Sequence, residues 1–546
     1  MSWFGFSFKR WQAFGKWVGL FCLGCFLAIG CAGNPDGQPT ATSELSGEPI
    51  TVGTTLKPRT LDPADAYEIS ASNLLYSLSD RLYTYKTGTT QLEPQLATAL
   101  PEISEDGLTY TIPVREGVVF HDGTSFNAEA MVFSLQRFIE NGGKPSALLS
   151  DLVESVEETG EYELKIQLKK PFAGFPALLT FVGTCAVSPQ AYEIGTGKFQ
   201  PGIFVGTGPY QLKDFRTDSA QMTVFEQYWG EKPANPGINF QFLTSPSNLY
   251  NSFQTGSIDV AYQSLDPQQI SSLQQAGKRG ASQTIQATGN VVSYLVLNLK
   301  QPPLDRLEVR RAIAALVDRS LLIERILQNQ ADPLYTLIPT TFEASEPVFK
   351  DRYGDGDGDK ALALLKEAGY SAENPLKLEV WYPSGSAIRA GVASTLRELA
   401  LQKLGGALQL EPKTVEAATA FGNIDKGIYP TFLLDWYPDF SDPDNYIHPF
   451  LNCKRGSAET GCEEGSSQSR GSFYYSDRVN QLIDQERQQQ DPASRQKTFI
   501  EIQEQLAEDV PYIPLWQNKD YAFAQNNVQD VQLDPIELLL LRQIRK

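Results

Sequence analysis

Two kinds of apolar spacing alternate along this chain and restrict the folds that it can adopt. Every second residue is apolar at 108–114 and again at 162–168, which is the pattern of strands with one buried face. Helical spacing appears at 128–140, after a potential cap at Asn127, and again at 492–506. Because strands and helices mix throughout without an internal repeat, we predict an α/β fold with mixed α+β lobes, not a barrel or a bundle.

The length and charge of the chain limit the number of domains and the kinds of partner that we expect. A chain of 546 residues exceeds the size at which a single core keeps growing, so two or three domains are expected. With 41% hydrophobic and 20% charged residues, the chain has enough apolar surface to fold. Its net charge of -19 repels nucleic-acid phosphates, and we therefore expect no nucleic-acid partner.

Common catalytic and metal-binding motifs are absent from the sequence. Its two histidines, His121 and His448, lie far apart, and no HExxH pair, phosphate-binding loop or G-x-S-x-G elbow occurs. The expectation is a protein without catalytic residues, metal or cofactor. A pair of acidic residues could still catalyse hydrolysis without any motif, so an enzyme stays an alternative.

The first residues resemble an export signal. Lys9, Arg10 and Lys16 precede an uncharged stretch at 17–30 that is short for a bilayer but suits a signal-peptide core. The stretch ends in LAIGC at Cys31 and resembles a bacterial lipoprotein signal, which implies cleavage before Cys31 and lipid attachment to its sulfur. A plain secretory signal or a short anchor helix is the alternative.

A flexible tether and a small disulfide loop are expected in the exported chain. Residues 31–49 are rich in Gly, Pro, Ser and Thr, as flexible tethers are. In an oxidising compartment, Cys453 and Cys462 can close the polar loop between them. Cys185 lies in an apolar stretch that suggests a buried free thiol, although a pairing through Cys185 stays open.

The acidic run DGDGD at 355–359 suggests a calcium loop at first sight. Counting from Asp355, the sixth position is Lys360 and the twelfth is Lys366, where a calcium-binding hand needs glycine and glutamate. We therefore predict a solvated, flexible loop before a helix.

Several long stretches resemble one family throughout. The segment LEPQLATALPEISEDGLTYTIPVREGVVFHDGTSFNAEAMVFSLQRF at 92–138 is similar to the extracellular solute-binding proteins, family 5, of peptide, dipeptide and nickel ABC importers. Further stretches from about residue 50 onward are similar to the same family and occur in the same order as in its members. Among them are TLDPADAYE, VGTGPYQLKDF, FQTGSIDV, ALLKEAGY, WYPDFSDPDNY and LAEDVPYIPLW.

The resemblance implies a two-lobed periplasmic binding protein fold of the class with an extra domain and a hinge between the lobes. It divides the chain into a signal peptide (1–30), a tether (31–49), a discontinuous lobe I (50–90, 205–290 and 505–546), an extra domain of that lobe (91–204) and lobe II (291–504).

The stretch WYPDFSDPDNY at 436–446 carries the predicted ligand site. The resemblance implies that Asp439 receives the α-ammonium group of a peptide, and such a charge-assisted bond in a dry cleft selects a free amino terminus. Asp442 and Asp444 flank a proline, which is typical of turns that satisfy their own backbone, so a structural role is expected for both.

Aromatic residues around Asp439 complete the predicted site. Trp436, Tyr437 and Phe440 could form its walls, although core packing is the alternative for Phe440. Tyr67 and Ile69 follow TLDP at the place where family members approach ligand from the other lobe.

The resemblance implies a monomeric substrate-binding lipoprotein, anchored outside the cytoplasm by its lipid, that passes short peptides to ABC permease and ATPase subunits. Binding of a metal chelate such as nickel, or of an oligosaccharide, is the alternative within the same transporter class. Other classes are a peptide-holding chaperone and a glycoside hydrolase that uses Asp439 with a neighbouring carboxylate.

Overall fold

The computed structural model describes residues 47–534 and 538–546. The predicted signal peptide at 1–30, the predicted lipidation site Cys31 and the predicted tether up to residue 46 lie outside the described residues. None of the helices in the described ranges combines the length and the apolar character needed to cross a bilayer.

The largest sheet of the described chain is 11-stranded and runs in the order β15-β14-β16-β12-β19-β11-β1-β10-β9-β8, with β13 pairing to β19. Its strands are β1 (Ile50–Thr54), β8 (Tyr210–Phe215), β9 (Ser219–Val224), β10 (Gly237–Phe242), β11 (Val260–Tyr262), β12 (Gln283–Leu297), β13 (Ala331–Pro333), β14 (Leu376–Pro383), β15 (Leu408–Val415), β16 (Thr431–Trp436) and β19 (Tyr512–Ala524).

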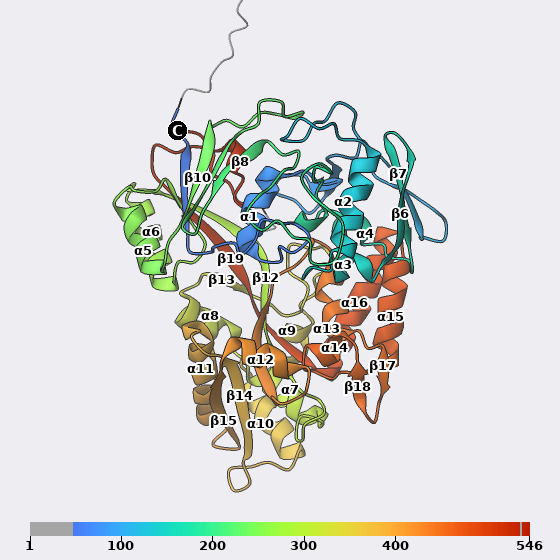
Figure 1. Ribbon diagram of the computed structural model, residues 1–546. Coiled ribbons are helices and arrows are strands. Elements are labelled where there is room, and N and C mark those ends of the chain that lie inside the picture. The colour runs from blue at the N-terminus through green and yellow to red at the C-terminus, as the bar shows by residue number, and fades with distance from the viewer. Residues whose placement is uncertain (1–46, 535–537) are drawn as a thin grey trace, which may run out of the picture. The chain divides into compact units, whose positions relative to one another are not determined.

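Strands β12 and β19 form the longest pairing in this sheet. They are antiparallel, from Gln283 opposite Ala524 to Val296 opposite Tyr512, with an irregularity between Thr288 and Val292. Figure 1 shows both strands running from the part of the sheet that holds β1 and β10 to the part that holds β14 and β15. One continuous strand pair therefore connects the two ends of the sheet.

Two large hydrophobic cores lie at the two ends of this strand pair. One core draws on residues between 292 and 516. The other draws on residues between 50 and 262 and between 522 and 544, and it also includes Phe440. Residues 91–204, the predicted extra domain, contribute to the same core as residues 50–90. Phe440 lies within the sequence range of the first core, but its side chain packs in the second core.

The predicted strands at 108–114 and 162–168 are confirmed as β5 and β7 of a four-stranded antiparallel sheet. This sheet contains β4 (Glu102–Ile103), β5 (Thr109–Pro113), β6 (Val153–Gly160) and β7 (Glu163–Leu168). The predicted helix is also confirmed as α2 (Ala128–Glu140), and the Asn127 side chain accepts a hydrogen bond of 3.0 Å from the amide of Ala130.

Two hairpins form separate two-stranded sheets. Their strands are β2 (Tyr83–Tyr85) with β3 (Leu92–Pro94), and β17 (Arg455–Ser457) with β18 (Gly461–Glu464). A disulfide joins Cys453 to Cys462 at this second hairpin, with 5.7 Å between the Cα atoms. Cys185 is buried with a free thiol, and burial raises its pKa to about 12.

Helices cover the faces of these sheets (Figure 1). The remaining α-helices of the described chain are α1 (Ile69–Leu78), α3 (Ala147–Ser150), α4 (Phe175–Leu178), α5 (Pro246–Gln254), α6 (Pro267–Lys278), α7 (Leu307–Leu316), α8 (Arg319–Leu327), α9 (Val348–Tyr353), α10 (Gly358–Glu367), α11 (Ala387–Lys403), α12 (Ala417–Ile424), α13 (His448–Leu451), α14 (Ser466–Ser469), α15 (Asp477–Gln488) and α16 (Pro492–Asp509). Single turns of 3₁₀-helix are η1 (Val182–Thr184), η2 (Pro443–Tyr446) and η3 (Leu541–Gln543).

The acidic run at 355–359 leads into α10, so the helix predicted after it is confirmed, and its Asp357 and Asp359 are exposed. Asp355 differs from the predicted solvated loop, because it is partly buried and hydrogen-bonded. The Asp355 carboxylate accepts hydrogen bonds from the amide of Arg319 (2.8 Å) and the hydroxyl of Ser320 (3.0 Å). Asp357 caps α10 by accepting from the amide of Lys360 at 3.0 Å. Both carboxylates thus accept hydrogen bonds from backbone amides and stabilise the local fold. Within the described ranges, no cluster of three or more His, Cys, Asp or Glu residues is placed to hold a metal ion.

His121 connects the VGTGPY segment at 205–210 to the core of residues 50–262. Its Nδ1 accepts a hydrogen bond from the amide of Gly206 at 3.3 Å, so its Nε2 is the donor to the carbonyl of Gly208 at 3.0 Å. A methyl group on Gly208 would collide with the backbone of Leu78. The neutral imidazole therefore holds a turn whose glycine permits close packing on α1.

The burial of His121 should make the protein less stable at acidic pH. Burial lowers the pKa of His121 from 6.5 to about 4. The unfolded chain takes up a proton near pH 6.5 that the folded chain accepts only near pH 4, so stability falls as the pH decreases through this range. Between pH 7 and pH 5 we expect a loss of about 2 kcal/mol from this group.

Urea unfolding at the two pH values measures this loss. In a His121→Asn variant, the difference in unfolding free energy between pH 7 and pH 5 should shrink by that amount, whatever the variant's stability at pH 7. An undiminished difference would contradict the assignment of the neutral, buried imidazole.

Candidate functional site

The six predicted ligand-site residues meet around one cavity. This cavity has a volume of about 330 Å³, and its walls come from the start of α1, from the segment after β16 and from residues near α14. It is lined by Tyr67, Glu68, Ile69, Ser72, Tyr76, Tyr85, Thr180, Phe181, Phe421, Asp435, Trp436, Tyr437, Pro438, Asp439, Phe440, Arg470 and Leu538. Segments that are separated by more than 350 residues thus converge here, and we call this space the Asp439 cavity.

Asn445 fixes the backbone that carries Asp439. The Asn445 amide oxygen accepts hydrogen bonds from the Asp439 amide (3.1 Å) and from the indole nitrogen of Trp436 (3.2 Å). Asn445 itself is buried on η2. One side chain therefore sets the turn between the end of β16 and the Asp439 carboxylate. No motif in the sequence marks Asn445 as a functional residue, because an asparagine after Asp-Pro-Asp is typical only of a turn.

The Asp439 carboxylate is surrounded mainly by neutral partners. Burial raises its pKa above the usual range, whereas hydrogen bonding to Tyr67 and to Asn445 and the positive charge of Arg470 act in the opposite direction. No residue that the structure describes forms a salt bridge with Asp439 within 4.0 Å. The carboxylate is therefore only partly compensated, and a ligand cation would stabilise its charged form.

The aromatic side chains that line the cavity differ in their exposed fraction. Tyr67 and Tyr437 are 44% and 47% exposed. Trp436 and Phe440 are buried, with Trp436 packed edge-to-face on Phe450 and beneath the guanidinium of Arg470 at 4.4 Å. Tyr67 and Tyr437 thus have the larger exposed surfaces for contact with a ligand, whereas most of the Trp436 ring is packed against other side chains.

Phe440 packs into the core formed by residues 50–262. Its ring meets that of Phe172 in an edge-to-face arrangement with 6.1 Å between the centroids. The core-packing alternative that the sequence left open for Phe440 therefore accounts for most of its surface, although the ring also lines the cavity.

Asp442 and Asp444 have structural partners within the chain. Arg495 donates two hydrogen bonds of 2.7 Å to the Asp442 carboxylate and also pairs with Glu486 at 2.9 Å. Asp442 in turn accepts a 2.9 Å hydrogen bond from the amide of Asp444. Asp444 lies 3.9 Å from Arg487. Both side chains hold the turn, and Arg495 supplies a cation that the sequence pattern did not indicate.

Two arginines contribute positive charge to this region, one in the cavity wall and one beside Asp435. Arg470 lines the cavity, and Arg389 on α11 forms a salt bridge with Asp435, whose other oxygen accepts from Ser293 at 2.5 Å. No local motif marks either arginine, because each reaches the site from a distant segment. Asp435 therefore already has a cationic partner.

Two cores joined by a continuous strand pair, with a cavity lined from both groups of segments, define a two-lobed solute-binding fold. A model of the bacterial extracellular solute-binding proteins, family 5, matches residues 91–458. The chain belongs to this family, which confirms the resemblance seen in the sequence. Proteins of this family bind solutes outside the cytoplasm for ABC importers.

Relatives and solved structures cover most of the chain. Di/tripeptide-binding protein 2 of Pseudomonas aeruginosa is 25% identical over 91% of this chain and 95% of its own length. Heme-binding protein A of Haemophilus influenzae is 27% identical over 81% and 82%. The crystal structure of NikA from Brucella suis in complex with Fe(III)-EDTA has a TM-score of 0.79 at 22% identity, covering 91% of this chain and all of that chain.

Removal of Arg495 should destabilise the turn that carries Asp439. In an Arg495→Met variant, Asp442 and Glu486 lose their cation, and we expect the free energy of unfolding in urea to fall by about 3–5 kcal/mol. Arg478→Met on α15 is the matched control, because its pair with Glu501 is exposed and should contribute less than about 1 kcal/mol. Equal losses in the two variants would contradict the structural role of Arg495.

Proposed function

We propose that this protein captures short peptides with a free amino terminus and presents them to the permease and ATPase subunits of an ABC importer. The observation that carries the proposal is the Asp439 carboxylate, which faces a cavity without a salt-bridge partner among the described residues. A peptide α-ammonium group is the complementary charge, and a charge-assisted bond in a desolvated site is stronger than a neutral one. The name of the Pseudomonas relative supports the same class of ligand.

Lobe closure would couple binding to transport. Tyr67 and Ile69 come from the segment whose core includes β1, whereas Trp436 ends β16 in the other core group and Tyr437 follows it directly. A ligand that touches both sets of residues stabilises the arrangement in which they are close together. The β12 and β19 pair, with its irregularity after Thr288, is the connection about which the two groups would move.

Other ligands and an enzymatic role fit the Asp439 cavity less well. Its lining contains no His or Cys, so nickel would find no imidazole or thiolate ligand there. A glycosidase would need a second carboxylate beside Asp439. The lining carboxylates of Asp435 and Glu68 are paired with Arg389 and Arg59, respectively. These pairings favour binding over catalysis.

Replacement of Asp439 should remove affinity selectively. An Asp439→Asn variant should bind a tripeptide with a free amino terminus at least about 30-fold more weakly by calorimetry, because the ammonium loses its counter-charge. Its thermal unfolding without ligand should stay nearly unchanged. An Asp359→Asn variant, altered at an exposed site on α10, is the matched control and should bind normally.

An amino-acetylated peptide tests the chemistry of the same contact. Wild-type protein should bind it as weakly as the Asp439→Asn variant binds the free peptide. Equal affinity of wild-type protein for acetylated and free peptides would overturn the proposed role of Asp439.

We also propose that the mature protein begins at Cys31 and is attached to the cell membrane through lipid on that sulfur, and that it acts as a monomer. A Cys31→Ala variant should shift from the membrane fraction to the soluble fraction of the exported protein. Cys25→Ala is the matched control and should stay with the membrane, because Cys25 lies in the segment removed with the signal. Membrane retention of both variants would refute lipid attachment at Cys31.

A further inference from the structure

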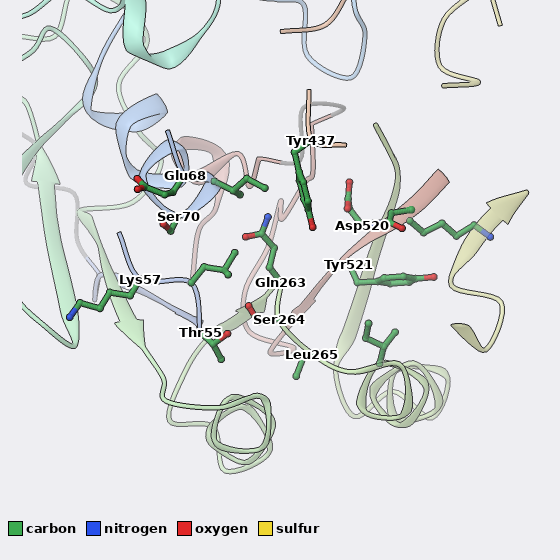
Figure 2. Close-up of a pocket in the computed structure, with 15 residues that line it drawn as sticks. Thr55, Lys57, Glu68, Ser70, Gln263, Ser264, Leu265, Tyr437, Asp520 and Tyr521 are labelled. Carbon is green, nitrogen blue, oxygen red and sulfur yellow. The ribbon is translucent and has the colours of Figure 1, made fainter. Parts of the chain in front are cut away.

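A second cavity adjoins the Asp439 cavity. It has a volume of about 590 Å³ and shares Glu68, Ile69 and Tyr437 with the first cavity. Figure 2 shows the Tyr437 side chain extending into this space, with Gln263, Asp520 and Tyr521 around it. A ligand whose amino group lies at Asp439 would therefore pass Tyr437 to enter this second space, which we call the Asp520 cavity.

One oxygen of the Asp520 carboxylate in this cavity lacks a hydrogen-bond partner. Asp520 lies on β19 opposite Ala287, and its Oδ2 atom is buried without a hydrogen bond to any residue that the structure describes. The carboxylate lies against Gly289, where an added methyl group would collide with it. Burial raises the pKa of Asp520 to about 7. A carboxylate in this setting is costly unless a cation or donor reaches it.

The other charged residues that line the Asp520 cavity are paired or exposed. Glu68 forms a salt bridge with Arg59 at 2.9 Å. Lys519 forms one with Asp332, also at 2.9 Å. Lys57 is exposed and, in Figure 2, extends away from Asp520 on the opposite side of the cavity. Among the described residues that line this space, Asp520 is therefore the carboxylate that forms no salt bridge.

We propose that the Asp520 cavity is a subsite for a cationic side chain, so that the protein prefers peptides that contain lysine or arginine. This inference rests on the proposed peptide-binding function. An ammonium or guanidinium group would supply the donor and the opposite charge that Asp520 lacks. The rings of Tyr437 and Tyr521 would cover the apolar stem of the same side chain, as aromatic surfaces do for long basic residues.

The volume of the cavity is consistent with this assignment. About 590 Å³ exceeds the space in the Asp439 cavity and lies within the range of pockets that enclose small ligands. The position of Asp520 on β19 adds rigidity, because this strand pairs with β12, β11 and β13. A fixed carboxylate on a paired strand can discriminate charge without first becoming ordered.

Calorimetry with matched tripeptides tests the subsite. The probes are trialanine peptides with one lysine, or one uncharged norleucine of similar length, at each of the three positions. Wild-type protein should bind the lysine peptide about tenfold or more tightly than its norleucine partner at one position at least. Asp520→Asn, which preserves the shape of the side chain, should abolish this preference and leave norleucine-peptide affinities within about twofold.

Controls separate this inference from the proposed function. Asp359→Asn should keep the lysine preference, and thermal unfolding should show that Asp520→Asn is folded. If peptides bind but wild-type protein shows no lysine preference, or if Asp520→Asn retains it, the subsite is overturned and the proposed function stands. If no peptide with a free amino terminus binds at any position, the proposed function fails and the subsite fails with it.

Discussion

The pairing of β12 with β19 is the interaction on which the rest of the structure depends. The two strands share a ladder from Gln283 to Val296. Strand β19 contributes buried residues to both hydrophobic cores, whereas β12 contributes buried residues to one core and packs the half-buried Ile285 against the other. The chain therefore passes between the cores through hydrogen-bonded strands, which restrict their relative movement to bending and twisting. Gly289 lies in the irregular part of this ladder and makes room for the Asp520 carboxylate. The strand pair that connects the two cores therefore also forms part of the wall of the Asp520 cavity.

Charge is distributed unevenly along the segment that carries the site. Asp435 and Asp442, which flank Asp439, each have an arginine within the chain, whereas Asp439 has hydrogen-bonding partners and only the more distant positive charge of Arg470. Removing the cation from one such pair costs several kcal/mol, so the paired aspartates can hold a turn rigidly. An aspartate that lacks such a pair is available to a ligand. The same contrast distinguishes Asp520 from Glu68 and Lys519 in the neighbouring cavity.

Much of the local structure followed from the sequence because short-range rules govern it. Alternation gave β5 and β7, and Asn127 caps α2 as its position predicted. Local rules failed at Asp355, whose hydrogen bonds to Arg319 and Ser320 join residues that are 36 and 35 positions apart.

The sequence by itself determined the family, the mixed α/β class and the group of aromatic and acidic residues from which the site is built, because these are written in contiguous stretches. Only the tertiary structure decided which aspartate has no salt bridge. That distinction depends on Arg389, Arg487 and Arg495, which approach from α11, from α15 and from α16. The Asp520 cavity likewise exists only where α1, the segment after β16 and β19 meet. Electrostatic compensation acts through space, and a linear sequence does not record which charges become neighbours.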